Sequence, residues 1–389
     1  MFTTKEGVDV GRGAGWSRPD AARIQRAGGM SKVPRLSICI TTLNRARFIG
    51  ETLDSIVPQL TPDVEVVIVD GGSTDGTGDV VRPYLERTPQ IRYFNTGTGG
   101  PVVPNAGYYA DCDYNIEQAR GEHIWLFSDD DLLVPHAVET VLRELGDGDP
   151  DLLIVDSEVR DLAVDRLFEP TRLPIRERRD YRPEDRDAFM ADAGNTLTFL
   201  GVVIIRRSCW LTRDSKAYYG SYFMHVGVIF QQPPLPHARV LPQALVQIRM
   251  GNAMWTHRSF EIWMATWPKL IWGFEGYSDA AKAAVVPREP WRAFLQILGY
   301  RAYGSFTRSD YRAHVAPRAG LLERLRAQLV LALPGPLAHI LVMTMVAVSR
   351  SRHGSVAYNL LVASRNSNPV SRAIGRLIGH SLPARTPAS

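Results

Sequence analysis

The sequence predicts an α/β fold with a mostly parallel central sheet and helices on both of its faces. Two observations support this prediction. Between residues 35 and 145, short runs of β-branched and other apolar residues alternate with segments of helical periodicity. Turn residues, such as the glycine pair at 71–72, separate the two kinds of segment. Such alternation is typical of parallel sheets, because parallel strands need a crossover connection that is usually a helix.

Four apolar runs predict the strands of this sheet. LSICITT (36–42) and VEVVIVD (64–70) are uninterrupted or nearly so, as expected for strands that are buried on both faces. A shorter strand is expected over 91–97, and HIWLF (123–127) predicts the fourth. Beyond Asp151 the pattern becomes mixed, and DLLIVDSEV and LTFLGVVIIRR predict further strands.

Helices are expected between these strands, each with its own signal. The segment 45–60 has an apolar face at helical spacing, made of Phe48, Ile49, Leu53 and Ile56. Ser73 and Asp75 are good cap residues for a helix that continues to residue 87. A helix from residue 113 is expected to end at Gly121, and Pro135 opens a helix to residue 145.

The chain is expected to have three regions: a flexible polar leader over 1–33, an α/β domain over 34–275 and a helical region over 276–389. The leader contains no apolar run of the signal-peptide type. The three cysteines of the chain have no metal-ligand spacing, which predicts reduced thiols in a cytoplasmic protein.

The last part of the chain is basic and also contains an apolar segment. After Glu323 the chain has no acidic residue but has eight arginines, which suggests an anionic partner. The uncharged segment 329–348 favours a membrane surface over nucleic acid. Because Pro334 and Pro336 interrupt that segment and His339 lies in it, we expect a broken helix in the cytoplasmic leaflet. A membrane span and a buried core helix are the alternatives.

Three consecutive carboxylates, Asp129, Asp130 and Asp131, follow the strand 123–127 directly. Adjacent carboxylates repel one another, and a divalent cation compensates this cost. Mg²⁺ and Mn²⁺ prefer carboxylate oxygens and keep coordination positions free for phosphate. We therefore predict that Asp129 and Asp131 hold a metal ion and a diphosphate. A solvated acidic turn is the alternative.

The turn after the second strand contains Asp70, Gly72 and Ser73. Asp70 can accept hydrogen bonds from a nucleobase N–H or a ribose hydroxyl, and the glycines allow close approach of the backbone. A capping turn for the next helix is an alternative that is compatible with this role.

The end of the first strand carries polar side chains in Thr41, Thr42, Asn44 and Arg45. Hydroxyls, an amide and a guanidinium suit a nucleoside and its phosphates. An ordinary strand-to-helix turn is the alternative. Parallel sheets bind ligands at the carboxyl ends of their strands, where all three clusters are expected.

In their order and spacing, TTLNR, VDGGSTDGT and FSDDD resemble the family-2 glycosyltransferases of GT-A fold. The resemblance covers roughly residues 36–142. It implies that these segments bind a nucleotide diphosphate sugar together with Mn²⁺ or Mg²⁺, and that Asp130 reaches the donor sugar.

A closer resemblance, to the abequosyltransferase-like branch of that family, extends to about Trp272. It rests on DYNIEQARGEHIWLFSDDDLL, SYFMHVGVIF, IRMGNAMWT and FEIWMATWPKLIW. That branch makes bacterial surface polysaccharides. Asp113 and Asn115 stand where many family members have an Arg-Asn pair, and they are expected to take part in donor binding.

The resemblance leaves the catalytic base open. Family members usually place a carboxylate near the acceptor hydroxyl, but the comparable segment YYGSYFMHVGVIF contains no acid. His225 is its only titratable group apart from tyrosines, so it is a candidate base or a further metal ligand. A structural histidine is one alternative, and Asp131 is the alternative base.

The segment IRMGNAMWT supplies Arg249, Asn252 and Trp255 as further donor-site candidates. Arg249 is expected to neutralise the leaving diphosphate, where charge develops in the transition state. Trp255 is expected to stack on a sugar ring. The tryptophans at 255, 263, 267 and 272 are also spaced as a helix face, which favours a packing role for most of them.

Together these features predict an inverting, metal-dependent glycosyltransferase with a nucleotide diphosphate sugar as donor and a lipid-linked saccharide as acceptor. The resemblance places it in bacterial O-antigen, capsule or exopolysaccharide synthesis, peripheral or monotopic at the inner face of the plasma membrane, with no nucleic acid partner. One alternative is a nucleotidyltransferase, although TTLNR is a poor phosphate loop. The other is a non-catalytic membrane scaffold that binds nucleotide sugars, which the missing acid near His225 favours.

Overall fold

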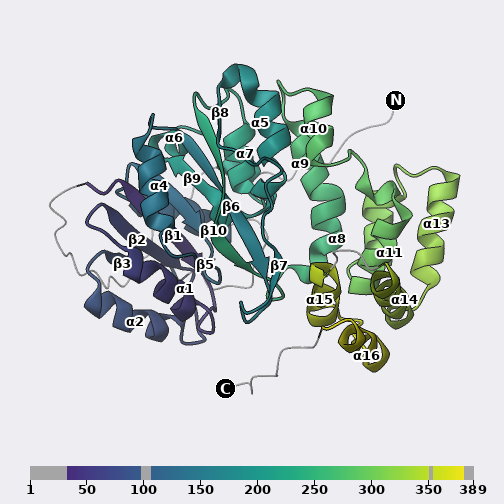
Figure 1. Cartoon of the computed structure of the whole chain (residues 1–389). Coiled ribbons are helices and arrows are strands. Elements are labelled where there is room, and N and C mark those ends of the chain that lie inside the picture. Colours follow the sequence, from purple (N-terminus) through teal and green to yellow (C-terminus); the bar gives the residue numbers. More distant parts are fainter. Residues whose placement is uncertain (1–32, 98–106, 350–353, 381–389) are drawn as a thin grey trace, which may run out of the picture.

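The computed structural model describes residues 33–97, 107–349 and 354–380. Apart from Val33, the predicted leader lies outside these residues. In Figure 1 the strands gather in one part of the molecule and the helices of the C-terminal part stand beside them.

A single ten-stranded sheet organises the first part, with the strand order β3-β2-β1-β4-β9-β6-β10-β5. Its first four strands are all parallel: β1 (Leu36–Thr42), β2 (Val64–Asp70), β3 (Ile91–Asn95) and β4 (His123–Phe127). Every residue of β2 is buried, as expected for a strand that is covered on both faces.

The other half of the sheet is mixed. β9 (Val203–Arg206) runs antiparallel to both β4 and β6 (Leu152–Arg160), and β10 (Ala238–Arg249) runs parallel to β6. The short strands β5, β7 and β8 add antiparallel pairs, and they cover Leu132–Leu133, Leu167–Glu169 and Arg179–Tyr181. The α/β prediction is confirmed, and the mostly parallel pattern applies to the β3–β4 half.

The strand directions bring the carboxyl ends of six strands, β1 to β4 with β6 and β10, to one edge of the sheet. β6 is antiparallel to β9, which is antiparallel to β4, so β6 and its parallel neighbour β10 run in the same direction as β1, β2 and β4. Residues that follow Thr42, Asp70 and Phe127 therefore lie at the same edge as Arg249, the last residue of β10.

Helices are present at all four predicted places: α1 (Ile49–Ile56), α2 (Thr77–Arg87), α3 (Gly107–Gln118) and α4 (Ala137–Gly146). α1 is shorter than the predicted 45–60 because a 3₁₀ turn with Pro58 follows it. α2 starts four residues after Ser73, behind Gly76, which has a φ of 90°. Three more short helices belong to this part, namely α5 (Arg186–Ala193), α6 (Arg207–Leu211) and α7 (Met224–Phe230).

Two hydrophobic cores divide the chain. The first surrounds the sheet and continues through α9 (Trp267–Gly273) and α10 (Asp279–Val285) to Val286. The boundary expected at 275 thus lies within this core. The second core is helical and starts with Phe260 in α8 (Ser259–Glu261). It is formed mainly by α11 (Phe294–Tyr303), α13 (Leu321–Ala332), α14 (Gly335–Val348) and α15 (Gly354–Ala363), with α12 (Arg308–Asp310) and α16 (Pro369–Leu377) beside them.

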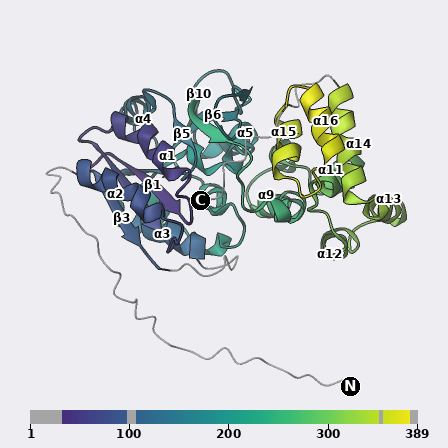
Figure 2. The ribbon, with the colours of Figure 1, turned by 90° about the horizontal axis from the view of Figure 1, so that it is seen from below.

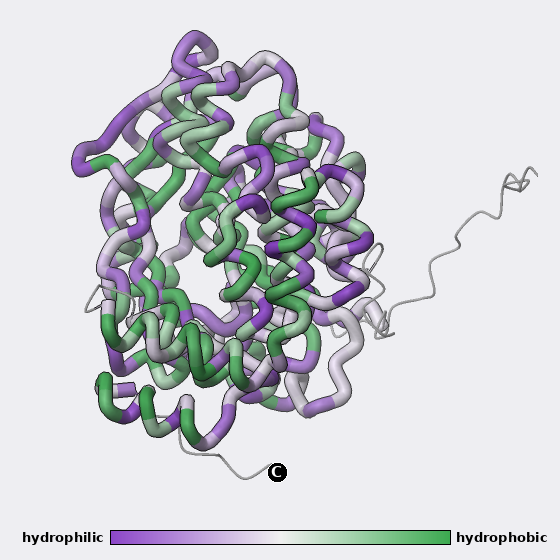
Figure 3. The backbone as a smooth tube through the Cα atoms, turned by 90° about the vertical axis from the view of Figure 1, so that its right-hand side faces the viewer, coloured by the Kyte–Doolittle hydropathy of each residue, from purple (hydrophilic) through white to green (hydrophobic). Residues whose placement is uncertain are grey.

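The helical part packs on the mixed side of the sheet. Figures 1 and 2 both show α15 nearer to the β6–β7 side than to β3. The hydroxyl of Tyr358 accepts a hydrogen bond from the backbone N–H of Leu162 at 2.9 Å, and Ser355 donates to Glu169 at 2.9 Å. Tyr358 and Leu162 also form a small apolar cluster with Phe48. Figure 3 looks onto this helical side, where hydrophobic and hydrophilic turns alternate along the backbone.

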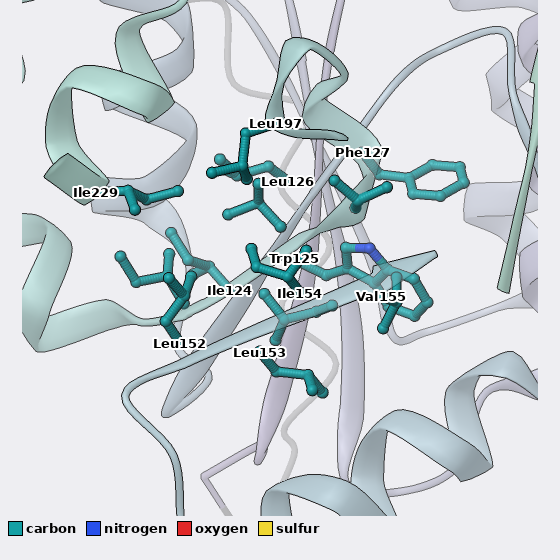
Figure 4. Close-up of a cluster of buried hydrophobic side chains, with 14 of the residues drawn as sticks. Ile124, Trp125, Leu126, Phe127, Leu152, Leu153, Ile154, Val155, Leu197 and Ile229 are labelled. Carbon is teal, nitrogen blue, oxygen red and sulfur yellow. The ribbon is translucent and has the colours of Figure 1, made fainter. Parts of the chain in front are cut away.

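Part of the first core is formed by side chains of β4 and β6, the two strands on either side of β9. Figure 4 shows Trp125 and Ile124 of β4 beside Leu153 and Ile154 of β6. The Trp125 side chain is fully buried, and its indole N–H donates to the backbone carbonyl of Gly201 at 2.8 Å. Because its one polar atom has a partner, the large ring is buried without an unsatisfied donor.

Gly121, the predicted helix end, lies against β1. A Cβ at residue 121 would lie 2.6 Å from the backbone nitrogen of Ser37 and 2.8 Å from the carbonyl carbon of Leu36. We predict that Gly121→Ala lowers the free energy of unfolding by about 1–3 kcal/mol, because backbone atoms cannot move aside cheaply. Urea denaturation measures the change.

Gly299→Ala is the control for this substitution. Residue 299 lies inside α11 with open space around its Cβ position. Alanine there should raise the free energy of unfolding by about 0.5–1 kcal/mol, since alanine is the better helix former. Equal effects of the two substitutions would contradict the predicted close contact at Gly121.

Candidate functional site

The loops after β1 and β2 are joined by hydrogen bonds. The Asn44 backbone N–H donates to the Ser73 hydroxyl at 2.7 Å, and the Asn44 side-chain oxygen accepts from the Thr74 N–H at 2.9 Å. The Arg45 N–H donates to the Thr77 hydroxyl at 2.8 Å. Asn44 has a φ of 54°, which asparagine tolerates better than most residues. The two predicted nucleotide-binding segments therefore form one surface.

Asp70 is fully buried and shapes the turn that follows it. Its Oδ1 accepts from the backbone N–H groups of Gly72 at 2.9 Å and Ser73 at 2.7 Å. Its Oδ2 accepts from the Tyr93 hydroxyl. Asp70 thus stabilises the turn after β2, whereas α2 begins behind Gly76 without a side-chain cap. A contact of Asp70 with a nucleoside stays a prediction.

Arg45 connects these loops to the acidic triplet, Asp129–Asp131, that follows β4. Its Nε lies 3.3 Å from the Asp129 carboxylate, and its Nη2 lies 3.7 Å from that of Asp130. Thr42, two positions before the Asn44 turn, is also buried. The three polar clusters that were predicted at the ends of β1, β2 and β4 therefore lie together.

Burial dominates the electrostatics of the triplet. The pKa of Asp129 is raised to about 7, first because the side chain is removed from water and then because Asp130 is negative. The same two causes raise the pKa of Asp131 well above its usual value, and burial also raises the pKa of Asp130. Arg45 opposes the rise at Asp129 and Asp130.

Arg249 holds the triplet from the end of β10. Its backbone N–H donates to the Asp131 carboxylate at 2.7 Å, and its guanidinium donates to the Asp130 carbonyl at 2.8 Å. The same guanidinium also donates to the Leu162 carbonyl at 2.6 Å and pairs with Glu51. Arg249 is buried, and these contacts make it a residue that positions the triplet. Neutralisation of a leaving diphosphate by Arg249 stays a prediction.

Asn252 reaches the triplet from the segment beyond β10, where its side-chain amide donates to the Asp130 carboxylate. The third candidate of that segment, Trp255, is 39 % exposed, and its ring lies 5.9 Å from that of Trp263. Trp267 is buried against Phe223, with 4.6 Å between ring centroids, so the predicted packing role applies to it.

The donor set of the triplet fits a divalent cation. Asp129 and Asp131 are two buried carboxylates whose pKa values are raised, so a positive ion beside them would relieve the cost of their ionisation. Mg²⁺ and Mn²⁺ take such oxygen ligands.

A different acidic group lies at the start of β4. Ligand atoms of Glu122, His123 and Asp149 lie within 4.8 Å of one another. Arg206 already pairs with the carboxylates of Glu122 and Asp149. Arg206 therefore already balances the charges of Glu122 and Asp149. The buried carboxylates of Asp129 and Asp131 are less completely paired, so a cation would stabilise the triplet more.

His225 lines a cavity of about 50 Å³ between α3 and α7, together with Thr41, Asn115 and Phe127. Its Nε2 lies 2.7 Å from the Leu197 carbonyl, so that nitrogen carries a proton and donates. Burial lowers the pKa of His225 to about 4, which makes the ring neutral at pH 7. Its roles as a metal ligand and as a base stay predictions.

Asp113 and Asn115, which both belong to α3, lie in different environments. Asn115 donates to the Ile40 carbonyl at 2.8 Å, and its buried side-chain oxygen has no hydrogen-bond partner in the part of the chain that the structure describes. The Asp113 carboxylate accepts three side-chain hydrogen bonds, from Trp210, Ser215 and Tyr219 at 3.0, 2.6 and 2.7 Å. Asp113 thus anchors the segment before α7, whereas Asn115 retains a free acceptor.

Two residues at the site were missed by the sequence reasoning. Glu51 neutralises Arg249, and Tyr93 donates to Asp70. Glu51 lies on the polar side of an amphipathic helix, where an acid is ordinary. Tyr93 lies in the third strand, where it pairs with Ile68, two positions before the last pair, Asp70 with Asn95. The contact between Tyr93 and Asp70 could have been predicted only from the register of the two strands.

The family model described as Glycosyl transferase family 2 matches residues 37–204, which include the three clusters at the strand ends. Residues 37–204 form a glycosyl transferase family 2 domain. The family resemblance predicted over residues 36–142 is thereby confirmed for this domain. His225, Arg249, Asn252 and Trp255 lie beyond the matched residues.

Relatives of the chain include an abequosyltransferase, RfbV, of Salmonella typhimurium, which is 25% identical over 206 residues that make up 50% of this chain and 60% of that protein. The validoxylamine A glucosyltransferase of Streptomyces hygroscopicus subsp. limoneus is 42% identical over 127 residues, 30% of this chain and 25% of that protein. The chain therefore spans less than two thirds of the length of either relative.

Among solved structures, a mannosyltransferase from Pyrobaculum calidifontis in complex with GDP-Man and Mn²⁺ superposes with a TM-score of 0.48. The two chains are 16% identical, and the alignment covers 90% of this chain and 88% of the other.

The raised pKa of Asp129 predicts how stability depends on pH. The folded state binds more protons than the unfolded state between the usual aspartate pKa and about 7. The free energy of unfolding must therefore fall as the pH rises through that window. In EDTA at pH 8, Asp129→Asn should be more stable than the wild type by about 2–4 kcal/mol, because no charge is then buried at that position.

Urea denaturation at pH 8 and at pH 4.5 measures this difference, which should shrink at the lower pH. Asp165→Asn, at an exposed aspartate, is the control and should change stability little at either pH. An Asp129→Asn protein that is less stable than the wild type at pH 8 would contradict the predicted cost of the buried charge.

Proposed function

We propose that this chain is an inverting, metal-dependent glycosyltransferase that moves a sugar from a nucleotide diphosphate donor to a saccharide acceptor. The observation that supports this most is the buried triplet Asp129–Asp131, which lies within a family 2 domain and contacts the loop after β1. Uncompensated, such a group of carboxylates lowers stability, so a use for it is expected.

The proposed donor site follows from the contacts at the sheet edge. Asp129 and Asp131 would hold the cation, which supplies positive charge to the departing nucleoside diphosphate. The joined loops of Asn44 and Ser73 would contact the nucleoside. Asp130, whose carboxylate is fixed by Asn252, would contact the sugar.

Of the two candidate bases, Asp131 fits better. A histidine with a pKa of about 4 is a weak base, and the Nε2 of His225 is occupied by the Leu197 carbonyl. The raised pKa of Asp131 brings it closer to the neutral range in which a general base works best. One Asp131 oxygen accepts from the backbone N–H of Arg249, which fixes the orientation of the carboxylate.

The names of the two relatives, an abequosyltransferase and a glucosyltransferase, support sugar transfer as the reaction. We propose a lipid-linked acceptor and a role in bacterial surface polysaccharide synthesis. The C-terminal helices support a lipid-linked acceptor, because they place apolar side chains on the surface.

The segment expected to bind a membrane is a broken pair of helices. α13 and α14 meet at an angle of 104°. Among the residues that the structure describes, no single helix is long and apolar enough to cross a membrane. Taken together, α13 and α14 have the required length and apolar composition. Leu329 is 70% exposed and Leu341 is 45% exposed, with Arg324 and Arg326 nearby in α13. We propose that this surface lies on the inner face of the plasma membrane.

Asp131→Asn tests the proposed reaction. We expect it to lower sugar transfer by about a hundredfold or more, because both the cation site and the candidate base lose a charge. The measurement is release of the nucleoside diphosphate from a panel of nucleotide sugars, with Mn²⁺ or Mg²⁺ and a lipid-linked acceptor fraction.

Glu122→Gln is the matched control, since it removes a carboxylate of the acidic group at the opposite end of β4. It should leave transfer and its dependence on Mn²⁺ unchanged. Full activity of Asp131→Asn, or loss of metal dependence only in Glu122→Gln, would refute the metal assignment.

Leu329→Gln combined with Leu341→Gln tests the membrane surface. Each exposed leucine that enters the lipid contributes on the order of 1–2 kcal/mol, so the double variant should sediment poorly with vesicles that contain phosphatidylglycerol. Leu211→Gln, at a leucine of α6 that is 46% exposed, is the control and should sediment like the wild type. Equal sedimentation of all three proteins would refute this surface.

A further inference from the structure

A second pocket, of about 200 Å³, lies between the segment that follows β10 and the C-terminal helices. Residues of the segment 251–257 line one side. Tyr303 from the end of α11, with Ala363 and Arg365 from the end of α15, lines the other. The pocket is therefore built jointly by the two parts of the molecule.

This pocket is adjacent to the acidic triplet. Gly251 and Ala253 line it, and Asn252 between them donates to the Asp130 carboxylate. Gly251 has a φ of 106°, and a Cβ there would lie 3.0 Å from a methyl carbon of Val362. Residue 251 must therefore be glycine for its backbone to approach α15 this closely. The pocket thus lies next to Asn252, which contacts Asp130 at the proposed sugar site.

The pocket lining contains a guanidinium and an imidazole as hydrogen-bond donors. Arg365 and His257 line it, and its lining contains no aspartate or glutamate. Within the described ranges, no carboxylate has an ion-pair contact with Arg365 at 4.0 Å or less. Glu261, which lies four positions after His257, pairs with Arg258 through two contacts of 2.9 Å. An exposed guanidinium without a carboxylate partner favours phosphate as a ligand.

We propose that this pocket binds the phosphate or diphosphate that joins the acceptor saccharide to its lipid. The proposal rests on the proposed function, and it adds the place of the acceptor. The phosphates would lie on Arg365 and His257, with the saccharide directed toward Asp130. Met254, which lines the pocket and is 58% exposed, offers an apolar contact for the start of the lipid chain.

Binding of inorganic pyrophosphate to the full chain in EDTA tests the site. Without a divalent cation the acidic triplet repels anions, so bound pyrophosphate reports a different place. Titration calorimetry should show binding to the wild type, and Arg365→Gln should weaken it about tenfold or more, as expected for the loss of a charged hydrogen-bond donor. His257→Ala should weaken it in the same direction, because a ring N–H that can donate to the anion is lost.

Arg308→Gln is the charge-matched control, since Arg308 is an exposed arginine of α12 outside the pocket lining. It should bind pyrophosphate like the wild type. The proposal is refuted if the wild type does not bind, or if Arg365→Gln binds equally well. Because no transfer is measured, this result is independent of whether the proposed reaction occurs.

Competition identifies the source of the phosphate. Farnesyl diphosphate, a soluble isoprenoid diphosphate, should displace pyrophosphate from the wild type but compete poorly in Arg365→Gln. Vesicles that contain phosphatidylglycerol should not displace it. Displacement by the vesicles and not by farnesyl diphosphate would show a headgroup site and overturn the assignment to the acceptor.

Discussion

The burial of Asp129 and Asp131, on either side of the partly buried Asp130 at one edge of the sheet, is the constraint on which the rest of the site depends. Loss of water and mutual repulsion raise the pKa of Asp129 and Asp131. The surrounding chain opposes this cost with Arg45, with the backbone N–H of Arg249 and with the amide of Asn252. These come from loops far apart in sequence, so the triplet fixes how the strand ends are arranged.

Much of this arrangement could be predicted from the sequence, because it depends on local patterns. Apolar runs gave β1, β2 and β4, and polar residues directly after them identified the site edge. The mixed half of the sheet could not be predicted equally well, since antiparallel pairing of β9 with β4 and β6 is a long-range property. For the same reason the three partners of Asp113, all more than 90 positions away, had no signal in the sequence.

Arg249 shows why residue type alone is an insufficient guide to a role. An arginine near an expected diphosphate suggests direct charge neutralisation, but here the guanidinium is buried and contacts the Asp130 carbonyl, the Leu162 carbonyl and Glu51. A side chain with these partners cannot approach a ligand without giving them up. The contacts that the structure shows give Arg249 a positioning role toward the triplet, while its predicted role at the diphosphate stays a prediction.

The contacts of Arg249 also connect the triplet to the C-terminal helices. Leu162, whose carbonyl accepts from Arg249, donates its N–H to Tyr358 of α15. Phe48 packs in the same apolar cluster as Tyr358, and the guanidinium carbons of Arg45 and Arg249 lie 5.8 and 5.2 Å from the centre of its ring. Both arginines that serve the triplet thus touch a ring whose position depends on α15. The contacts of the two arginines therefore continue, through Phe48, to the packing of the C-terminal helices against the sheet domain.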